Sequence, residues 1–327
     1  MYKDKLSFIQ TQKAIKLIKD TFQKKLAEKL SLDRVTAPII VKAGSGINDD
    51  LNGVERKVEF TAKEIDGGIE IVQSLAKWKR MILARFGYLE GRGIYTDMNA
   101  LRRDDSVDST HSIFVDQWDW ERVISAPERT VDYLKNTVKK IMQALSETEE
   151  VVIENYPVFT KKVSGDVFFI TTQQLADMYP DKTRQERERL IAKEQKFVFL
   201  MQIGKVLKSG EVHDGRAPDY DDWELNGDII VWNEELGDAL ELSSMGIRVD
   251  AQSLAAQLKI SNAEDRKAFE YHKGVLSGSY PLTIGGGIGQ SRLCMFLLEK
   301  KHIGQVQFSV WPDAQRAELK EQGIELL

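Results

Sequence analysis

The sequence has little cysteine, no long apolar run and no excess of basic residues. Cys294 is the one cysteine among 327 residues, which excludes an internal disulfide. No apolar stretch approaches the roughly 20 residues of a membrane span, and the first residues have no apolar segment of the kind found in signal peptides. The net charge of −5 argues against a protein that mainly binds nucleic acid. These absences predict a cytoplasmic protein with neither a membrane nor a nucleic acid as its partner.

The remaining composition is that of a globular protein. Hydrophobic residues make up 42% and charged residues 30% of the chain. No linker, repeat or low-complexity tract divides it, so we expect a single domain over residues 1–327 with a helical insertion at about 126–200. Cys294 lies on the apolar side of a predicted helix, which indicates a buried structural thiol rather than a nucleophile.

The most informative stretch covers residues 281–298 and is rich in glycine. Gly285–Gly287 and Gly289 leave room for a flat or phosphorylated ligand to approach the backbone, because no Cβ stands in the way. Apolar residues then recur at helical spacing, and Arg292 falls in the first turn of this predicted helix. A glycine cluster before a helix is often only a tight turn. A planar cation beside it favours a binding site.

The N-terminal region predicts a long helix followed by a strand. Between residues 11 and 30 apolar side chains return every three or four positions, while lysines occupy the other face. The strand-like residues 35–41 follow directly and contain Pro38, which suits a sheet edge or an interface better than a sheet centre. The alternative is an ordinary surface helix.

A second helix begins after Ser74 and carries three cations. Lys77 and Arg80 lie three residues apart on one face, and Lys79 lies on another. A solvated helix face explains two of these cations, and the third can bind an anion.

A hairpin is predicted from two strands at residues 94–101 and 112–121. The first strand runs into Arg102, and alternation along the second places Gln117, Asp119 and Glu121 on one face. The hairpin therefore presents a row of polar groups beside a cation.

Two later strands each begin with a carboxylate, Asp228 and Glu241. Pairing of these strands would bring the carboxylates together, and paired carboxylates beside phosphate suit Mg²⁺. The alternative is two carboxylates at exposed strand ends.

These features follow one another in a recognisable order. The helix and Pro-containing strand resemble motif 1 of class II aminoacyl-tRNA synthetases, the Arg102 hairpin resembles motif 2, and the glycine-rich Arg292 helix resembles motif 3, above all in the aspartyl and asparaginyl branch. The resemblance spans nearly the whole chain. It implies an α/β (α+β) catalytic core with an antiparallel sheet flanked by helices, and a homodimer through residues 11–41. Since motif 1 begins near residue 11, we expect no anticodon-binding barrel before it.

Within that class the chain is similar to the ammonia-dependent asparagine synthetases. Four runs carry this resemblance: residues 74–80, 115–121, 216–223 and 241–250. It implies that ATP activates aspartate as β-aspartyl-AMP with release of diphosphate, and that ammonia then yields asparagine and AMP. The expected cofactor is Mg²⁺, and the expected partners are aspartate, ATP and ammonia.

The resemblance also implies roles for individual residues. Arg102 is expected to bind the α-phosphate, Arg292 the triphosphate tail, and Asp228 with Glu241 the metal ion. Where the family usually has a glutamate after the motif 2 arginine, this chain has Asp104. Further residues are expected on the nucleotide side: Arg216, Asp221, Ser243, Ser244 and Arg248.

For aspartate, the resemblance places Ser74 and Lys79 at the carboxylates and Asp119 with Gln117 at the ammonium group, with Ser244 also in contact. Asp49, in the glycine-rich loop at residues 44–53, matches a family aspartate that meets ammonia. The residues expected to act in catalysis are Asp49, Arg102 and Gln117.

Two other functions fit parts of this pattern. A ligase that passes the adenylate to tRNA or to a protein lysine would need a basic acceptor surface and an added recognition domain, and the sequence predicts neither. A non-catalytic sensor of aspartate or nucleotide would have lost catalytic positions, yet Arg102, Asp228, Glu241 and Arg292 are all present.

Overall fold

The fold is built around one large mixed sheet. A computed structural model describes residues 2–48 and 55–327. Within this part of the chain the sheet has eight strands, in the spatial order β1 (Leu32–Arg34), β5 (Gly93–Leu101), β6 (Phe114–Val123), β11 (Thr283–Gly289), β10 (Asp238–Arg248), β9 (Asp221–Asn233), β8 (Phe197–Met201) and β7 (Phe168–Thr171). Neighbours from β5 to β8 are antiparallel, and only the edge strands β1 and β7 run parallel to their neighbours. The predicted antiparallel sheet flanked by helices is confirmed.

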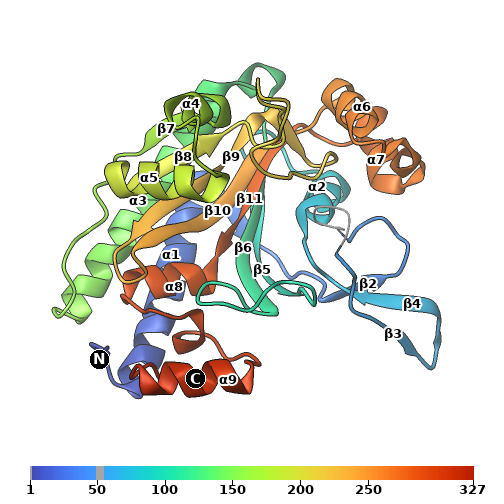
Figure 1. Cartoon of the computed structure of the whole chain (residues 1–327). Helices are drawn as coiled ribbons and strands as arrows, with labels where there is room; N and C mark the ends of the chain where they lie inside the picture. The colour runs from blue at the N-terminus through green and yellow to red at the C-terminus, as the bar shows by residue number, and fades with distance from the viewer. Residues whose placement is uncertain (1, 49–54) are drawn as a thin grey trace.

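One face of the sheet is covered by α1 (Phe8–Leu30), α3 (Val131–Asn155) and α8 (Gln290–Leu297), as Figure 1 shows. The predicted amphipathic helix is confirmed: its apolar stripe is buried, and Phe22 lies 4.8 Å from Trp118 of β6, measured between ring centroids. A capping box at Ser7 starts α1 by satisfying backbone groups at its first turn. This layer holds the main hydrophobic core.

The opposite face is only partly covered. Helices α4 (Thr172–Met178) and α5 (Arg184–Gln195) pack on the β7–β9 end, and α2 (Ala76–Arg85) packs near β6. Figure 1 shows α2 and α5 on either side of the middle strands, and residues of β6, β10 and β11 there line a cavity. The remaining helices are α6 (Ala251–Ile260), α7 (Glu270–Leu276), α9 (Asp313–Glu321) and the 3₁₀ turns η1 (Ala126–Glu128), η2 (Glu264–Ala268) and η3 (Ile303–Gln305). Among the described residues, none of the helices combines the length and apolar character needed to cross a bilayer.

The predicted strand at residues 35–41 is wrong as a single element. The chain instead forms β1 in the large sheet and then β2 (Ile40–Lys42) in a second sheet of order β2-β4-β3, with β3 (Glu59–Ala62) and β4 (Ile65–Ile71). Pro38 lies in the break between them. Proline has no N–H to donate to a strand neighbour, so the chain can leave one sheet there and enter another.

The glycines at 285–287 lie inside central strand β11 rather than in a turn. A Cβ on Gly285 would come within 2.0 Å of Oε2 of Glu121, and one on Gly286 within 2.5 Å of Cβ of Met245. Their absent side chains therefore make room for groups from β6 and β10 on either side. The predicted helix does follow, with Arg292 in its first turn.

Candidate active site

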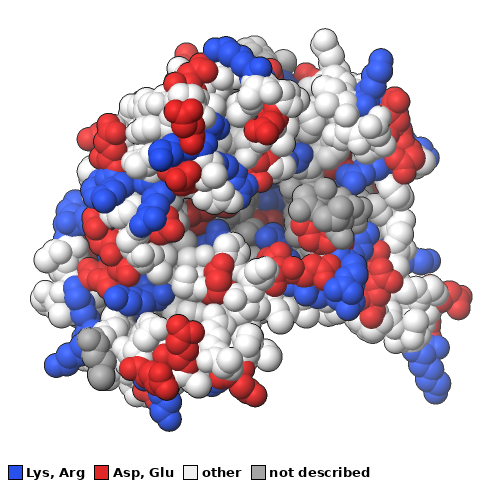
Figure 2. Space-filling model, in the orientation of Figure 1, with Lys and Arg blue, Asp and Glu red and all other residues white. Residues whose placement is uncertain are grey.

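A cavity of about 600 Å³ opens on the partly covered face of the sheet. Its floor is formed by β6, β11 and β10, and its walls by α2, α5 and the loops that contain Arg102 and Arg216. Figure 2 shows this hollow in the middle of the visible face, with basic and acidic side chains in its depth. A cavity of this size and polarity suits a small charged ligand or a nucleotide.

At one end of the cavity Lys79 and Asp119 form a buried ion pair. Lys79 Nζ lies 3.1 Å from Asp119 Oδ2 and donates to the carbonyl of Gly286 at 3.1 Å, and each side chain is 4% exposed or less. Burial lowers the pKa of Lys79, although Asp119 opposes this shift. Ser74 and Gln117 line the cavity beside this pair. The cavity thus offers a cation and an anion side by side, as an α-amino acid requires.

Lys77 and Arg80 of α2 were predicted to lie on a solvated face, and this prediction is wrong. Lys77 lies 3.5 Å from Asp219, and Arg80 donates to the carbonyls of Val249 and Pro281. Both side chains are buried. They hold α2 against the C-terminal part of the chain and so fix the position of Lys79.

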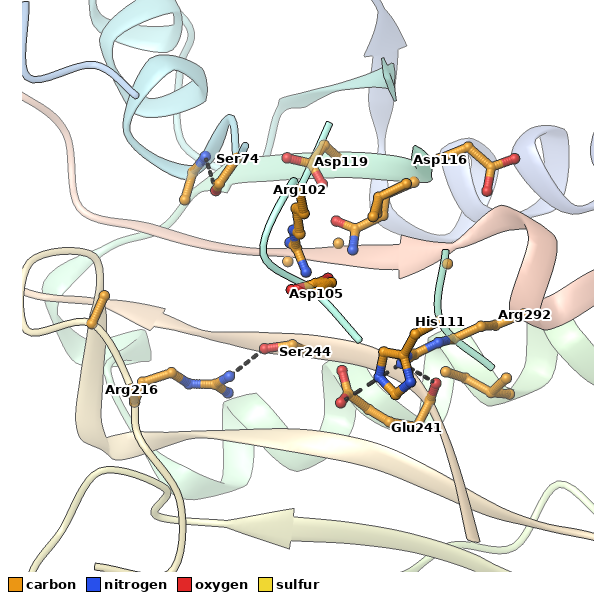
Figure 3. A pocket seen from close by; sticks show the side chains of 18 of the residues that line it. Ser74, Arg102, Asp105, His111, Asp116, Asp119, Arg216, Glu241, Ser244 and Arg292 are labelled. Atoms are coloured by element: carbon orange, nitrogen blue, oxygen red, sulfur yellow. Dashed lines mark hydrogen bonds and ion pairs between the residues drawn. The ribbon is translucent and has the colours of Figure 1, made fainter. Parts of the chain in front are cut away.

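Arg102 follows β5 and lines the cavity, where Figure 3 shows its side chain near Asp105. Its Nη2 donates to the carbonyl of Gln73 at 3.5 Å, while its Nε is buried without a partner. Asp104 turns instead to Arg56 and accepts from its backbone N–H at 2.7 Å. The neighbouring Asp105 is therefore the acidic residue of this loop that faces the cavity.

Two arginines are held rigidly over the floor by carboxylates. Arg248 Nε lies 3.0 Å from Glu121 Oε1, and the same guanidinium also pairs with Asp221. Arg216 Nη2 lies 2.8 Å from Asp228 Oδ1. Burial alone would lower the pKa of each arginine, but the carboxylates outweigh it and raise both values, so both stay charged. Cations fixed in this way need little reorganisation when an anion binds.

The metal candidates Asp228 and Glu241 lie on adjacent strands but not directly opposite each other. Asp228 pairs with Ser244, and Glu241 pairs with Ile230. A β-bulge between residues 241 and 243 shifts the alternation, so Glu241 and Ser244 both line the cavity. Burial raises the pKa of Asp228 to about 7, with Glu241 adding to this rise and Arg216 opposing it. Part of the rise thus reflects repulsion that a bound cation would relieve.

Arg292 reaches across from α8 to the cavity mouth. Its Nη1 donates to the carbonyl of Glu241 at 3.0 Å, its Nε donates to the carbonyl of Thr110 at 3.3 Å, and its guanidinium lies 3.8 Å from the Glu241 carboxylate. Figure 3 shows His111 beside this pair. Arg292 therefore ties the hairpin loop to β10.

The structure brings most of the predicted site residues together. Those lining the cavity are Ser74, Lys79, Arg102, Gln117, Asp119, Arg216, Asp221, Glu241, Ser244, Arg248 and Arg292. Asp228 contacts Arg216. Ser243 faces the opposite side of the sheet and donates to the carbonyl of Gly287, because the bulge reverses its direction. Asp49 lies outside the described residues.

Sequence reasoning missed several cavity residues with ionisable side chains, among them Asp105, His111 and Arg184. Asp105 and His111 belong to the loop after Arg102, and their place in that loop was a signal that could have pointed to them. Arg184 begins α5, far away in sequence, and pairs with Asp214 at the cavity wall. No local pattern marks it.

Comparison with known proteins identifies the family of the chain. The family model of aspartate-ammonia ligases matches residues 9–323. The chain is 56% identical over 327 residues to the aspartate–ammonia ligase of Clostridium tetani, with 100% of this chain and 96% of that protein covered. It is 52% identical over 326 residues to the aspartate–ammonia ligase of Bacillus cytotoxicus, with 100% of both chains covered.

Solved structures show the same fold at low sequence identity. The asparaginyl-tRNA synthetase of Pyrococcus horikoshii, complexed with asparaginyl-adenylate, has a TM-score of 0.66 at 16% identity. The matched region covers 93% of this chain and 70% of the synthetase chain. That of Entamoeba histolytica has a TM-score of 0.65 at 14% identity and covers 92% of this chain and 67% of its own. With the catalytic fold of class II aminoacyl-tRNA synthetases and full-length relatives above half identity, the chain belongs to the aspartate-ammonia ligase family.

Proposed function

We propose that this protein makes asparagine from aspartate, ammonia and ATP, through a β-aspartyl adenylate formed in the cavity. The observation that carries the proposal is the buried Lys79–Asp119 pair beside arginines fixed over the same floor. One part of the cavity therefore suits a zwitterionic amino acid, and the adjoining part suits a phosphate chain. Activation of a carboxylate by ATP needs both, side by side.

When aspartate binds, Lys79 and Asp119 exchange their contact with each other for contacts with the charged groups of the substrate. Lys79 would bind a substrate carboxylate and Asp119 the substrate ammonium group, so each buried charge keeps an opposite charge. Ser74, just before α2, can donate to a substrate carboxylate, and Gln117 on β6 can accept from the ammonium group through its amide oxygen. This places the β-carboxylate toward the arginines.

In the first step a β-carboxylate oxygen attacks the α-phosphorus of ATP, and the bond from that phosphorus to the diphosphate oxygen breaks. Negative charge grows on the phosphate oxygens in the transition state. Arg102 is the cation at the α-phosphate and Arg292 the cation at the departing diphosphate. Arg216 and Arg248, already held by carboxylates, keep their guanidinium groups in place beside the phosphates without moving.

In the second step the nitrogen of ammonia attacks the β-carbonyl carbon. The bond from this carbon to the phosphate oxygen breaks, AMP leaves, and the nitrogen loses a proton. Water competes for the same carbon, so a walled cavity that limits water favours amide formation. Asp49, outside the described residues, stays the predicted group that meets ammonia.

The proposal includes Mg²⁺ bound mainly through ATP. The described residues contain no group of three or more His, Cys, Asp and Glu side chains placed to hold a metal ion. Glu241 and Asp228 supply two carboxylates beside the proposed phosphate site, which fits an ion that takes its remaining ligands from phosphate and water. When bound there, Mg²⁺ neutralises charge on the phosphates.

A homodimer through residues 11–41 is also part of the proposal. Ile39 and Ile40 in this region are 57% and 46% exposed, which is consistent with a covered surface in an assembly. Light scattering should give about twice the chain mass of 37.2 kDa, and a mass of one chain would contradict the dimer. The cytoplasmic location and the absence of membrane and nucleic-acid partners stay predictions.

The test of this function is aspartate-dependent exchange of labelled diphosphate into ATP without ammonia. The wild type should catalyse it, and Lys79→Met should raise the KM for aspartate at least about tenfold, the worth of one charged hydrogen bond. The matched control is Lys140→Met, which removes an exposed lysine on α3 and should change nothing. Exchange that does not depend on aspartate would refute the proposed substrate.

A further inference from the structure

Helix α8, which carries Arg292, begins without a capping side chain of its own. Its first residue is Gln290, and the position before it is Gly289, which has no side chain to accept from the free backbone N–H groups of the first turn. A Cβ on Gly289 would lie 3.2 Å from Cβ of Arg292, so the tight turn from β11 leaves little room for one. An acceptor for these N–H groups has to come from another part of the chain.

Asp116 of β6 supplies this acceptor. Its Oδ1 accepts from the backbone N–H of Ser291 at 3.1 Å, and its Oδ2 accepts from the Ser291 hydroxyl at 2.9 Å. The side chain of Gln307 donates to the same Oδ1 at 3.2 Å, and Asp116 is 8% exposed. A carboxylate at this end of a helix is also favoured by the helix dipole. Two of these contacts are made to Ser291, the residue directly before Arg292.

Lys19 of α1 holds the other side of this carboxylate. Its Nζ lies 3.0 Å from Oδ2 of Asp116. Burial lowers the pKa of Lys19, but Asp116 opposes this shift and the pKa lies above its ordinary value, so Lys19 stays charged. Gln307 also donates to the Ser291 hydroxyl at 3.1 Å and accepts from the Ser112 hydroxyl at 2.6 Å. One buried carboxylate thus joins α1, β6, α8 and the segment after η3.

Arg292 is held both at its backbone and at its guanidinium. The guanidinium donates to the carbonyls of Thr110 and Glu241 at the cavity mouth, while the backbone belongs to the helical turn that Asp116 caps. Figure 3 draws Asp116 and Arg292 on the same side of the view. Because an arginine side chain has a fixed reach, a shift of this turn would displace the guanidinium from a bound phosphate, and small misplacements of this kind are costly in catalysis.

Building on the function proposed above, in which Arg292 binds the departing diphosphate, we propose that Asp116 is a positioning residue that fixes Arg292 through the first turn of α8. Alternation along β6 places Asp116 on the helix-covered face with Trp118, whereas Gln117 and Asp119 face the proposed aspartate site. Asp116 therefore acts on the phosphate end of ATP and not on aspartate.

The kinetic test measures aspartate-dependent exchange of labelled diphosphate into ATP, with Asp116→Asn and Arg292→Met alone and together. Asparagine has nearly the shape of aspartate, but it lacks the charge and accepts at one oxygen only. Asp116→Asn should raise the KM for ATP and for diphosphate at least about tenfold, as expected for a lost hydrogen bond to a charged group. The KM for aspartate should stay within about twofold. In the Arg292→Met background the same substitution should add less than about twofold, because the residue through which it acts is gone.

Glu149→Gln is the matched control for lost stability. Glu149 is 2% exposed and accepts from the backbone N–H groups of Lys162 and Val163, so it too is a buried carboxylate that holds backbone, but it does not line the cavity. This control should melt at a lower temperature with an unchanged KM for ATP. Lys19→Met is a second variant that keeps Asp116 in place and also lies outside the cavity wall. It should raise the KM for ATP about threefold, even if Asp116→Asn fails to fold.

Equal rises in the KM for aspartate and for ATP, or a lower melting temperature with an unchanged KM for ATP in both Lys19→Met and Asp116→Asn, would overturn the proposal. Effects of Asp116→Asn and Arg292→Met that multiply would also overturn it. They would show that Asp116 contacts ATP directly, since its carboxylate borders the cavity as well.

The same experiment separates this proposal from the function on which it rests. An unchanged KM for ATP in Arg292→Met would refute the phosphate role of Arg292, and the positioning role of Asp116 would fall with it. A wild type that shows no aspartate-dependent exchange would instead refute the proposed function.

Discussion

Arg248→Met should strongly destabilise this protein, because it removes the ion-pair partner of buried Glu121 and one of the two arginines paired with buried Asp221. The Glu121 and Asp221 side chains are both 0% exposed, and the Arg248 side chain is 3% exposed. After the substitution Glu121 keeps the Thr283 hydroxyl at 2.7 Å, and Asp221 keeps Arg216 at 3.3 Å. Removing one partner of a buried ion pair costs about 3–5 kcal/mol, against a total unfolding free energy of about 5–15 kcal/mol.

Urea unfolding with linear extrapolation measures this loss. The matched control is Arg92→Met, which removes a surface partner of Asp33 where the two side chains are 55% and 49% exposed, and should change the unfolding free energy by less than about 1 kcal/mol. A loss for Arg248→Met no larger than that of Arg92→Met would show that the buried carboxylates do not depend on Arg248.

The loss of unfolding free energy caused by Arg248→Met should also depend on pH. Burial alone would raise the pKa of Glu121, but Arg248 outweighs it and the pKa lies below its usual value. In the wild type the stabilisation from the Glu121–Arg248 ion pair is therefore present above the pKa of an unfolded glutamate. It is lost as the pH falls through the lower pKa that Glu121 has in the folded protein. Without Arg248, burial raises the pKa, so protonation relieves the buried charge. The difference between wild type and variant should shrink as the pH falls from neutral.

Gly285→Ala should lower the unfolding free energy by about 1–3 kcal/mol in urea, because its Cβ would lie 2.6 Å from the backbone oxygen of Trp120; an unchanged midpoint would contradict this. Burial and Glu241 raise the pKa of Asp228 to about 7, so the folded protein favours the protonated carboxyl. The contribution of Asp228 to the unfolding free energy is therefore complete below the pKa of an unfolded aspartate and is lost as the pH rises through 7. The urea midpoint of the wild type minus that of Asp228→Asn should therefore fall as the pH rises over this range. A difference that does not change with pH would contradict the raised pKa of Asp228. Burial raises the pKa of Cys294 to about 12, so a thiol reagent should label it only in the unfolded protein, and rapid labelling of the native protein would contradict its burial.

Much of the fold follows from local sequence patterns. The apolar spacing of α1 and the alternation along β6 depend on residues a few positions apart, so these elements could be predicted. The same holds for Arg292, whose place depends on the glycine strand ending at 289. The family resemblance then assembled these local features into one site.

Long-range contacts explain what the sequence pattern misjudged. Lys77 and Arg80 looked solvated because their partners, Asp219 and the carbonyl of Val249, lie far away along the chain. A bulge in β10, which the sequence pattern does not predict, turns Ser243 away from the cavity, while Ser244 lines it. The place of Arg184 likewise depends on packing of α5 against the sheet.

The most direct test of the proposed function is the nitrogen donor of the purified protein. AMP and asparagine should be measured after incubation with ATP, Mg²⁺ and aspartate, with ammonium, with glutamine, or with no donor. We expect equal amounts of AMP and asparagine with ammonium and almost none without a donor. ATP turnover with no asparagine in the presence of ammonium, or no turnover at all, would contradict it.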